Sequence, residues 1–142
     1  MGETAVLSGT DSNSANALAR QSATLSQPGT LASISINVAT AVGQMRLGVY
    51  DSAYHLLAQT AVFTPVSGWN TQLLNNVQVG AGTYWLAWFA SDNAMSNPIQ
   101  VGVGEGQWTS MTFGDMPATL PASSGTATEH WSIYATATLS VP

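Results

Sequence analysis

The sequence predicts an all-β domain in which two antiparallel sheets pack face to face, as a jelly roll or a related Greek-key sandwich. Three observations support this fold class. Segments that alternate apolar and polar residues recur along the 142-residue chain. Clusters of Gly, Pro, Asn and Asp separate these segments, which gives about eight to nine strands. Finally, no segment has the wide apolar stripe of an amphipathic helix.

The segment Gly82–Ala90 is the richest run of strand-forming residues in the chain. In an extended strand, alternate residues point to opposite faces. One face would carry Tyr84, Leu86 and Trp88, and the other Trp85, Ala87 and Phe89. Both faces are apolar, so this strand is either central and covered on both sides or presents aromatic rings to a partner.

The strands before this segment follow from alternation and turn residues. Gln27-Pro28-Gly29 is a strong turn signal, and Thr30–Val38 after it has a clean apolar/polar alternation. Ala17–Ser26 is more polar, so we expect it near an edge of a sheet. The other strands expected in this half are Thr4–Leu7, Gln44–Tyr50, Leu56–Phe63 and Gly68–Leu74, and Val77–Val79 leads into the central strand.

The remainder of the chain predicts two more strands, Ile99–Val103 and Trp131–Leu139. Between them, Gly104–Ser124 has little periodicity and is expected to be the longest irregular stretch. A loop of this length inside a compact domain is usually functional or packed by its own side chains. No linker or internal repeat is visible, so residues 1–142 are expected to form one domain.

The composition narrows the classes of function. The formal net charge is −5, lysine is missing, and Arg20 and Arg46 are the only strong cations. Two strong cations cannot neutralise a phosphate backbone or an anionic membrane surface. Neither a nucleic acid nor a membrane is therefore expected as a partner. There is no apolar run long enough for membrane insertion. No cysteine is present for a disulfide or a thiolate metal site. The start of the chain shows no signal peptide.

Several short segments together form a pattern of strand and turn signals. They are Arg46–Asp51, Leu56–Ala61, Gly68–Thr71, Ala81–Ala87, Thr112–Pro117 and Trp131–Tyr134. This pattern resembles accessory β-sandwich domains of bacterial extracellular and surface multidomain proteins, some of which look like carbohydrate-binding modules beside polysaccharide-degrading enzymes. The resemblance covers about two thirds of the chain, carries mostly strand and turn signals, and implies a location outside the cell or on its surface.

The sequence gives little support for an enzyme. A glycosidase needs two carboxylates that flank one bond, and no spacing forces Asp92, Glu105 and Asp115 to converge. His55 and His130 have no metal-like spacing, and no Gly-x-Ser-x-Gly motif occurs. We therefore expect a non-catalytic protein.

No cofactor is indicated by the sequence, and the metal content stays open. A structural calcium ion is conceivable, because sandwich domains use such ions to hold loops together. Asp51 and Asp11 would be its first ligands.

The aromatic residues suggest a binding site instead. Sugar rings have apolar C–H faces that match flat side chains, while polar side chains bond the hydroxyl groups. Trp108 lies in a Gly-rich polar stretch where strand packing does not explain a large ring. Trp85 and Trp88 are expected in the core, Trp69 at one end of the sandwich, and Trp131 on the inward face of the last strand. The residues expected to bind ligand are Trp108, Tyr54, Tyr50, Arg46, Asn93 and Glu105.

Three hypotheses follow in decreasing order of support. The first is a carbohydrate-binding module for a neutral glycan. The second is a structural, adhesive or assembly sandwich of a surface protein or a phage-type fibre, with no small ligand. It would place another subunit of a homo-oligomer, or a neighbouring domain, over the aromatic strand. The third is a hydrolase.

Overall fold

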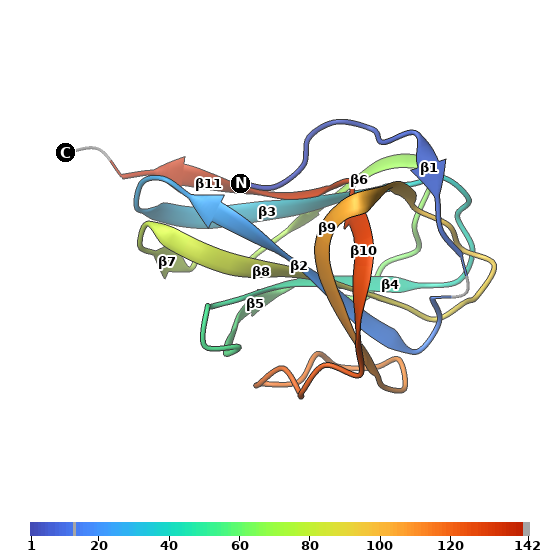
Figure 1. The fold of residues 1–142 in the computed structure, drawn as a ribbon. Helices are drawn as coiled ribbons and strands as arrows, with labels where there is room; N and C mark the ends of the chain where they lie inside the picture. Colours follow the sequence, from blue (N-terminus) through green and yellow to red (C-terminus); the bar gives the residue numbers. More distant parts are fainter. Residues whose placement is uncertain (13, 141–142) are drawn as a thin grey trace.

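The structure, a computed structural model, describes residues 1–12 and 14–140, and the side chains of all of these except Val103, Glu105 and Ala127. Within these ranges the chain is all-β, with no helix (Figure 1). None of the described residues therefore forms a helix that could cross a membrane. The strands are β1 (Gly9–Thr10), β2 (Ala17–Leu25), β3 (Gly29–Val38), β4 (Met45–Tyr50), β5 (Leu56–Gln59), β6 (Gly68–Leu73), β7 (Gln78–Val79), β8 (Gly82–Ala90), β9 (Pro98–Ser110), β10 (Gly125–Trp131) and β11 (Ile133–Leu139).

These strands form two antiparallel sheets, which confirms the predicted sandwich architecture. The larger, seven-stranded sheet has the order β1-β9-β2-β8-β4-β5, with β10 added on β9. The smaller has the order β11-β3-β6, and β7 also pairs with β3. The eleven strands exceed the predicted number because β1 and β7 are only two residues long and β10 was not foreseen.

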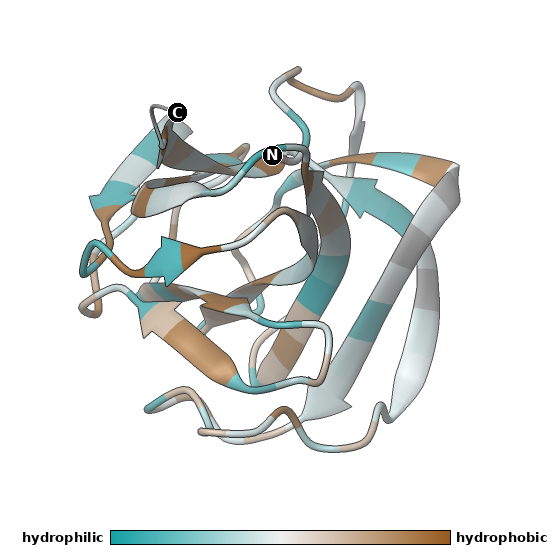
Figure 2. Ribbon diagram, turned by 90° about the vertical axis from the view of Figure 1, so that its left-hand side faces the viewer, coloured by the Kyte–Doolittle hydropathy of each residue, from teal (hydrophilic) through white to brown (hydrophobic). Residues whose placement is uncertain are grey.

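The main core lies between the two sheets. Apolar residues of β3 and β11 face those of β2, β4 and β8, and the cluster also includes Trp131. Figure 2 shows the pattern on the ribbon, with hydrophobic segments that alternate with hydrophilic ones along the strands. This alternation places one face of each sheet in the core.

Strand β8 is central, because it pairs with β2 on one side and β4 on the other. Leu86 and Trp88 point into the main core. On the opposite face, Ala87 and Phe89 are buried in a second cluster, with Met116 and Leu120. The segment 111–124 supplies these two residues and runs beneath the larger sheet, as the orange segment in Figure 1 shows. Of the two alternatives for the aromatic strand, the first therefore holds: it is covered on both sides.

The expected edge position of Ala17–Ser26 is wrong. Strand β2 lies between β9 and β8, inside the larger sheet. Its polar side chains are buried rather than solvated: Arg20 and Gln21 are 1% and 2% exposed. Gln21 bonds the backbone of Trp131 through both its amide nitrogen and its oxygen. Polarity at this strand therefore reflects internal hydrogen bonds and not contact with water.

The prediction for Gly104–Ser124 is also wrong in its first part. Strand β9 continues to Ser110, and only 111–124 is irregular. After it, β10 pairs along β9, with a register shift between Ala127 and Glu129. Figure 1 shows β9 and β10 arching together from the level of the smaller sheet down to segment 111–124. This hairpin closes one side of the sandwich and forms a wall of the site described next.

Candidate functional site

A hollow of about 530 Å³ opens between the β9–β10 hairpin and the chain segment that precedes β2. We call it the indole hollow. Its lining includes three of the five tryptophans of the chain. The described residues that line it are Asp11, Ser12, Ser14, Ala15, Asn16, Ala17, Ala19, Trp88, Trp108, Ser110, Thr126, Thr128, Glu129 and Trp131.

Trp108 is the accessible ring of the hollow, with 37% of its surface exposed. On β9 it lies between Ala19 of β2 and Gly125 of β10. A Cβ atom on Gly125 would lie 2.9 Å from three atoms of the indole ring. The glycine therefore lets the ring lie directly against the β10 backbone. The backbone of Trp108 is also held, because its carbonyl accepts a hydrogen bond of 2.8 Å from the amide of Ser124.

Trp131 and Trp88 form the back wall of the hollow. Their rings meet edge to face, with centroids 5.7 Å apart and an interplanar angle of 77°. Both are buried, at 4% and 1% exposure. The indole Nε1 of Trp131 donates a hydrogen bond of 2.8 Å to Asp11 Oδ2. A Cβ on Gly106 would lie 2.5 Å from the Trp131 ring, so that glycine also allows close packing. The wall is thus apolar and fixed.

Two carboxylates belong to the hollow. Asp11 accepts the Trp131 bond through Oδ2 and a bond of 2.9 Å from the backbone amide of Asn97 through Oδ1. Burial raises the pKa of Asp11 above its ordinary value, and the nearby charge of Glu129 acts in the same direction. Glu129 itself has no hydrogen-bond or ion-pair partner for its carboxylate among the described residues.

The segment before β2 forms the facing wall and is tied down from three sides. Asn93 Oδ1 accepts a hydrogen bond of 2.9 Å from the amide of Ala15. Asn16 Oδ1 accepts one of 2.9 Å from the amide of Phe113. Asn16 has a positive φ of 56°, a conformation that asparagine adopts more readily than most residues. Together with the Asp11 bonds, these contacts fix the facing wall of the hollow.

A smaller hollow of about 390 Å³ lies against Arg20, Tyr54, Gln107 and residues 120–123. The Arg20 guanidinium donates to Gln107 Oε1, Thr109 Oγ1 and the carbonyl of Pro121, at 3.1–3.2 Å. All three acceptors are neutral, and burial lowers the pKa of Arg20 below its ordinary value. These bonds hold segment 111–124 against the sheet, so we interpret Arg20 as structural.

Only part of the residue set expected from the sequence lies at the indole hollow. Trp108 lines it directly, and Asn93 fixes one of its walls. Trp108 belongs to a strand, not to the flexible loop that was expected. Glu105 is in β9, but its side chain lies outside the described residues.

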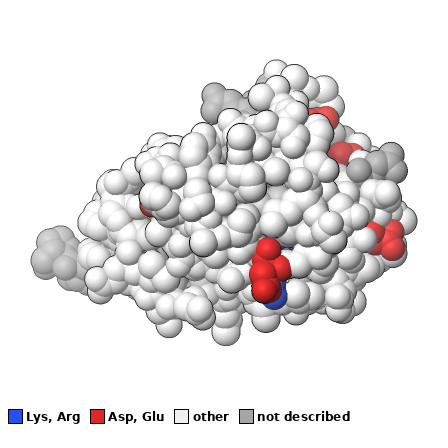
Figure 3. Space-filling view, turned by 90° about the horizontal axis from the view of Figure 1, so that it is seen from below, with Lys and Arg blue, Asp and Glu red and all other residues white. Residues whose placement is uncertain are grey.

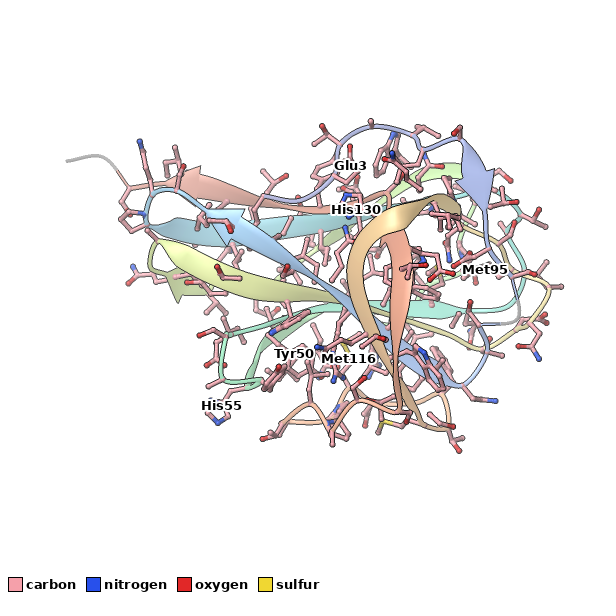
Figure 4. The ribbon with its side chains drawn as sticks, in the orientation of Figure 1. Glu3, Tyr50, His55, Met95, Met116 and His130 are labelled. Carbon is pink, nitrogen blue, oxygen red and sulfur yellow. The ribbon has the colours of Figure 1, made fainter. Side chains whose placement is uncertain are left out.

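The expectation that Tyr50 adds to a surface rim is wrong. Tyr50 is fully buried, and its hydroxyl donates a hydrogen bond of 2.7 Å to the carbonyl of Pro117. Figure 4 shows Tyr50 and Met116 beneath the larger sheet, and both belong to the second buried cluster. Segment 111–124 covers this position, so the outward-facing residue of a strand is buried here.

Tyr54 and Arg46 lie away from the indole hollow. Tyr54 stacks on Trp85, with centroids 5.7 Å apart, and lines the smaller hollow. Arg46 forms an ion pair with Asp115 and a hydrogen bond of 3.3 Å with Gln59. Arg46, expected to bind ligand, therefore pairs with a nearby acid of the same chain. Figure 3 shows how sparse charged side chains are on the face of the molecule seen from below.

The histidines pair with single acids. His130 Nε2 lies 3.1 Å from Glu3 Oε2, and Figure 4 shows these two side chains together. His55 Nδ1 lies 3.3 Å from Asp51 Oδ2 in the β4–β5 hairpin. Among the described residues, no group of three or more His, Cys, Asp or Glu side chains gathers in one place.

Sequence reasoning missed Trp131, Asp11 and Glu129 as parts of one site. Trp131 was assigned to the core, and Asp11 was considered only as a calcium ligand. The small alternating residues of Gly125–Trp131 are a weak strand signal that could have placed Glu129 beside β9.

The hollow combines one accessible indole face, five hydroxyl-bearing side chains in its described lining and two carboxylates. Such a site suits a ligand with apolar faces and polar edges. No family model, curated protein or solved structure matches this chain.

Proposed function

We propose that the protein is a non-catalytic carbohydrate-binding module that recognises a neutral glycan at the indole hollow, outside the cell or at its surface. The observation that carries this proposal is the position of Trp108. This tryptophan is 37% exposed and lies in a hollow lined with serine and threonine hydroxyls, and a concave site with an accessible aromatic face and a few polar groups is typical of ligand binding.

The physical argument is one of complementarity. A sugar ring has an apolar face of C–H groups and an edge of hydroxyl groups. The Trp108 face can stack on the first, and Ser110, Thr126 and Thr128 can donate to and accept from the second. The volume of about 530 Å³ lies within the range of small-ligand sites in proteins. Stacking of this kind contributes about 0.5–1.5 kcal/mol beyond buried area.

The second hypothesis, an assembly domain, loses the observation that motivated it. It assumed that another subunit or domain covers the aromatic strand. In the structure, segment 111–124 of the same chain covers the outer face of β8. The binding proposal therefore accounts for more of the aromatic residues than the assembly proposal does.

Isothermal titration and affinity electrophoresis against a panel of neutral polysaccharides test the proposal. We expect at least one glycan to bind, and Trp108→Ala to weaken that binding about tenfold or more, since a stacking platform contributes on the order of 1–3 kcal/mol.

The matched control is Trp69→Ala. Trp69 is also partly exposed but belongs to β6 of the smaller sheet, where it packs edge to face on Tyr134. We expect it to leave glycan affinity unchanged. The proposal fails if no glycan of the panel binds, or if both variants bind as wild type does.

A further inference from the structure

The charges that line the indole hollow are of one sign. Asp11 and Glu129 are its acids, and no Lys, Arg or His is among the described residues that line it. The nearest strand neighbour that is cationic, Arg20, follows Ala19 of the lining and points to the opposite face of the sheet, where it bonds Gln107, Thr109 and Pro121. No cationic side chain among the described lining residues therefore neutralises the charge of these carboxylates.

The two acids differ in the number of hydrogen bonds that their carboxylates accept within the protein. Both oxygens of Asp11 accept hydrogen bonds that hold the walls together. Glu129 makes no such bond with a described residue and is partly exposed. In a protein where Arg46, Arg20 and both histidines already have partners, Glu129 is an acceptor left available in the same hollow as Trp108.

We propose that the indole hollow selects a glycan unit that carries a free, protonated amino group, that is, a 2-amino-2-deoxyhexose. This inference rests on the proposed function and changes one part of it: neutral hexoses still bind at the hollow, and the protonated amino sugar binds there more tightly. The ammonium group forms an ion pair with Glu129 and lies against the indole of Trp108. The ring and its hydroxyl groups occupy the remainder of the hollow, beside Ser110, Thr126 and Thr128.

Each part of this arrangement has a physical basis. A tryptophan face attracts cations through its quadrupole more strongly than other aromatic rings do. A carboxylate next to it adds a charge-assisted hydrogen bond. The same carboxylates repel a uronate or a sulfated sugar, since like charges in a partly desolvated site disfavour binding. Selection therefore has an attractive part and a repulsive part.

Three matched pairs of monosaccharides test the inference, namely glucosamine and glucose, galactosamine and galactose, and mannosamine and mannose. The members of each pair share the ring and differ only at C2. Titrations at about pH 6, where the amine is protonated, should show a preference of about five- to tenfold for the amino sugar in at least one pair. Its N-acetylated form, which is uncharged, should bind like the parent hexose.

Glu129→Gln should remove this preference, because it keeps the size of the side chain and removes its charge. Asp115→Asn, which changes an exposed acid paired with Arg46, is the control and should keep the preference. If Glu129→Gln does not fold, the same question is tested with the wild-type protein. Raising the salt concentration from about 0.05 to 0.5 M should reduce its affinity for the amino sugar and leave its affinity for the hexose unchanged.

The outcomes separate this inference from the proposed function. Equal binding within all three pairs, or an unchanged preference in Glu129→Gln, overturns the amino-sugar inference and leaves the binding module intact. Absence of binding to all six sugars and to the polysaccharide panel overturns both.

Discussion

Gly106 and Gly125 determine how closely the tryptophans of the indole hollow approach the backbone. Neither has a positive φ, so conformational freedom is not the reason for glycine at these positions. The reason is space: a Cβ atom at Gly106 would lie 2.5 Å and 2.7 Å from two ring atoms of Trp131. A fixed backbone strand packs directly against each ring, which keeps the walls of the hollow in place without a ligand.

Gly106→Ala should therefore destabilise the protein. The added methyl group must displace Trp131, which is also held by Asp11, and overpacking of this kind costs about 1–3 kcal/mol. Urea denaturation would measure the loss. Gly114→Ala is the control, since the nearest atom to its Cβ would be the Thr112 carbonyl at 4.0 Å. Equal stability of the two variants would contradict the packing argument.

Asp11 gives the protein a stability that depends on pH. Burial raises its pKa in the folded state, so the folded protein keeps this proton over a range in which the unfolded chain has lost it. The contribution of Asp11 is therefore complete below the unfolded pKa of 3.8 and is lost as the pH rises through the folded pKa. Asp11→Asn cannot titrate, so the stability advantage of the wild type over this variant should shrink between about pH 3 and pH 7.

Asp51 is the control for this titration, because its pKa is shifted in the opposite direction. The backbone amides of His55 and Ala53 bond the Asp51 carboxylate and hold its pKa below the ordinary value. Its contribution is present above the unfolded pKa and is lost as the pH falls through the folded pKa. The advantage of the wild type over Asp51→Asn should therefore grow with rising pH. Urea denaturation in pH steps would measure both trends, and a gap that widens for Asp11→Asn would refute the argument.

Among the elements, segment 111–124 covers a face of the larger sheet although it has no regular secondary structure. It places Met116 and Leu120 on the outer face of the larger sheet, where a sandwich normally meets water. The polar contacts that hold it there include the Tyr50 hydroxyl on the Pro117 carbonyl and the Arg20 guanidinium on the Pro121 carbonyl. The segment is thus a partial third layer that buries one face of β8.

Tyr50→Phe should loosen this layer locally. The variant loses one hydrogen bond and leaves the Pro117 carbonyl without this partner, at a cost of about 1 kcal/mol. Amide hydrogen exchange should become faster in residues 116–121, while glycan affinity is unchanged. Tyr84→Phe removes a similar bond of 2.6 Å to the Gly80 carbonyl and should have its effect near that turn instead. Faster exchange across β8 in Tyr50→Phe would contradict a local anchor.

For the molecule as a whole, the sequence predicts those strands that have a strong local signal. Strands β3 and β8 were located within one residue, β3 because its apolar and polar residues alternate and β8 because it is a bounded run rich in aromatic residues. The β9–β10 hairpin was not predicted. Gly102, Gly104 and Gly106 interrupt the strand signal of β9, because glycine is depleted in strands, and the hairpin depends on pairing between segments distant in the chain.

The candidate site was predictable only in part, for the same reason. Trp108 was identified because a large ring in a Gly-rich polar stretch lacked a packing explanation. Asp11 and Glu129 could not be assigned to the same site. Asp11 lies near the start of the chain and Glu129 near its end, and the two meet only through the fold. Tyr50 was misplaced because alternation cannot show that a distant segment covers the outer face of a strand.

The walls of the indole hollow come from both ends of the chain and from its middle, so an unfolded polypeptide has no binding site at all. A saturating sugar must then add to the free energy of unfolding by mass action, about 2.7 kcal/mol at a hundredfold excess over Kd. A thermal melt in the presence of each sugar can thus rank affinities without a label, and any compound that raises the midpoint reports assembly of the native molecule and recognition at once.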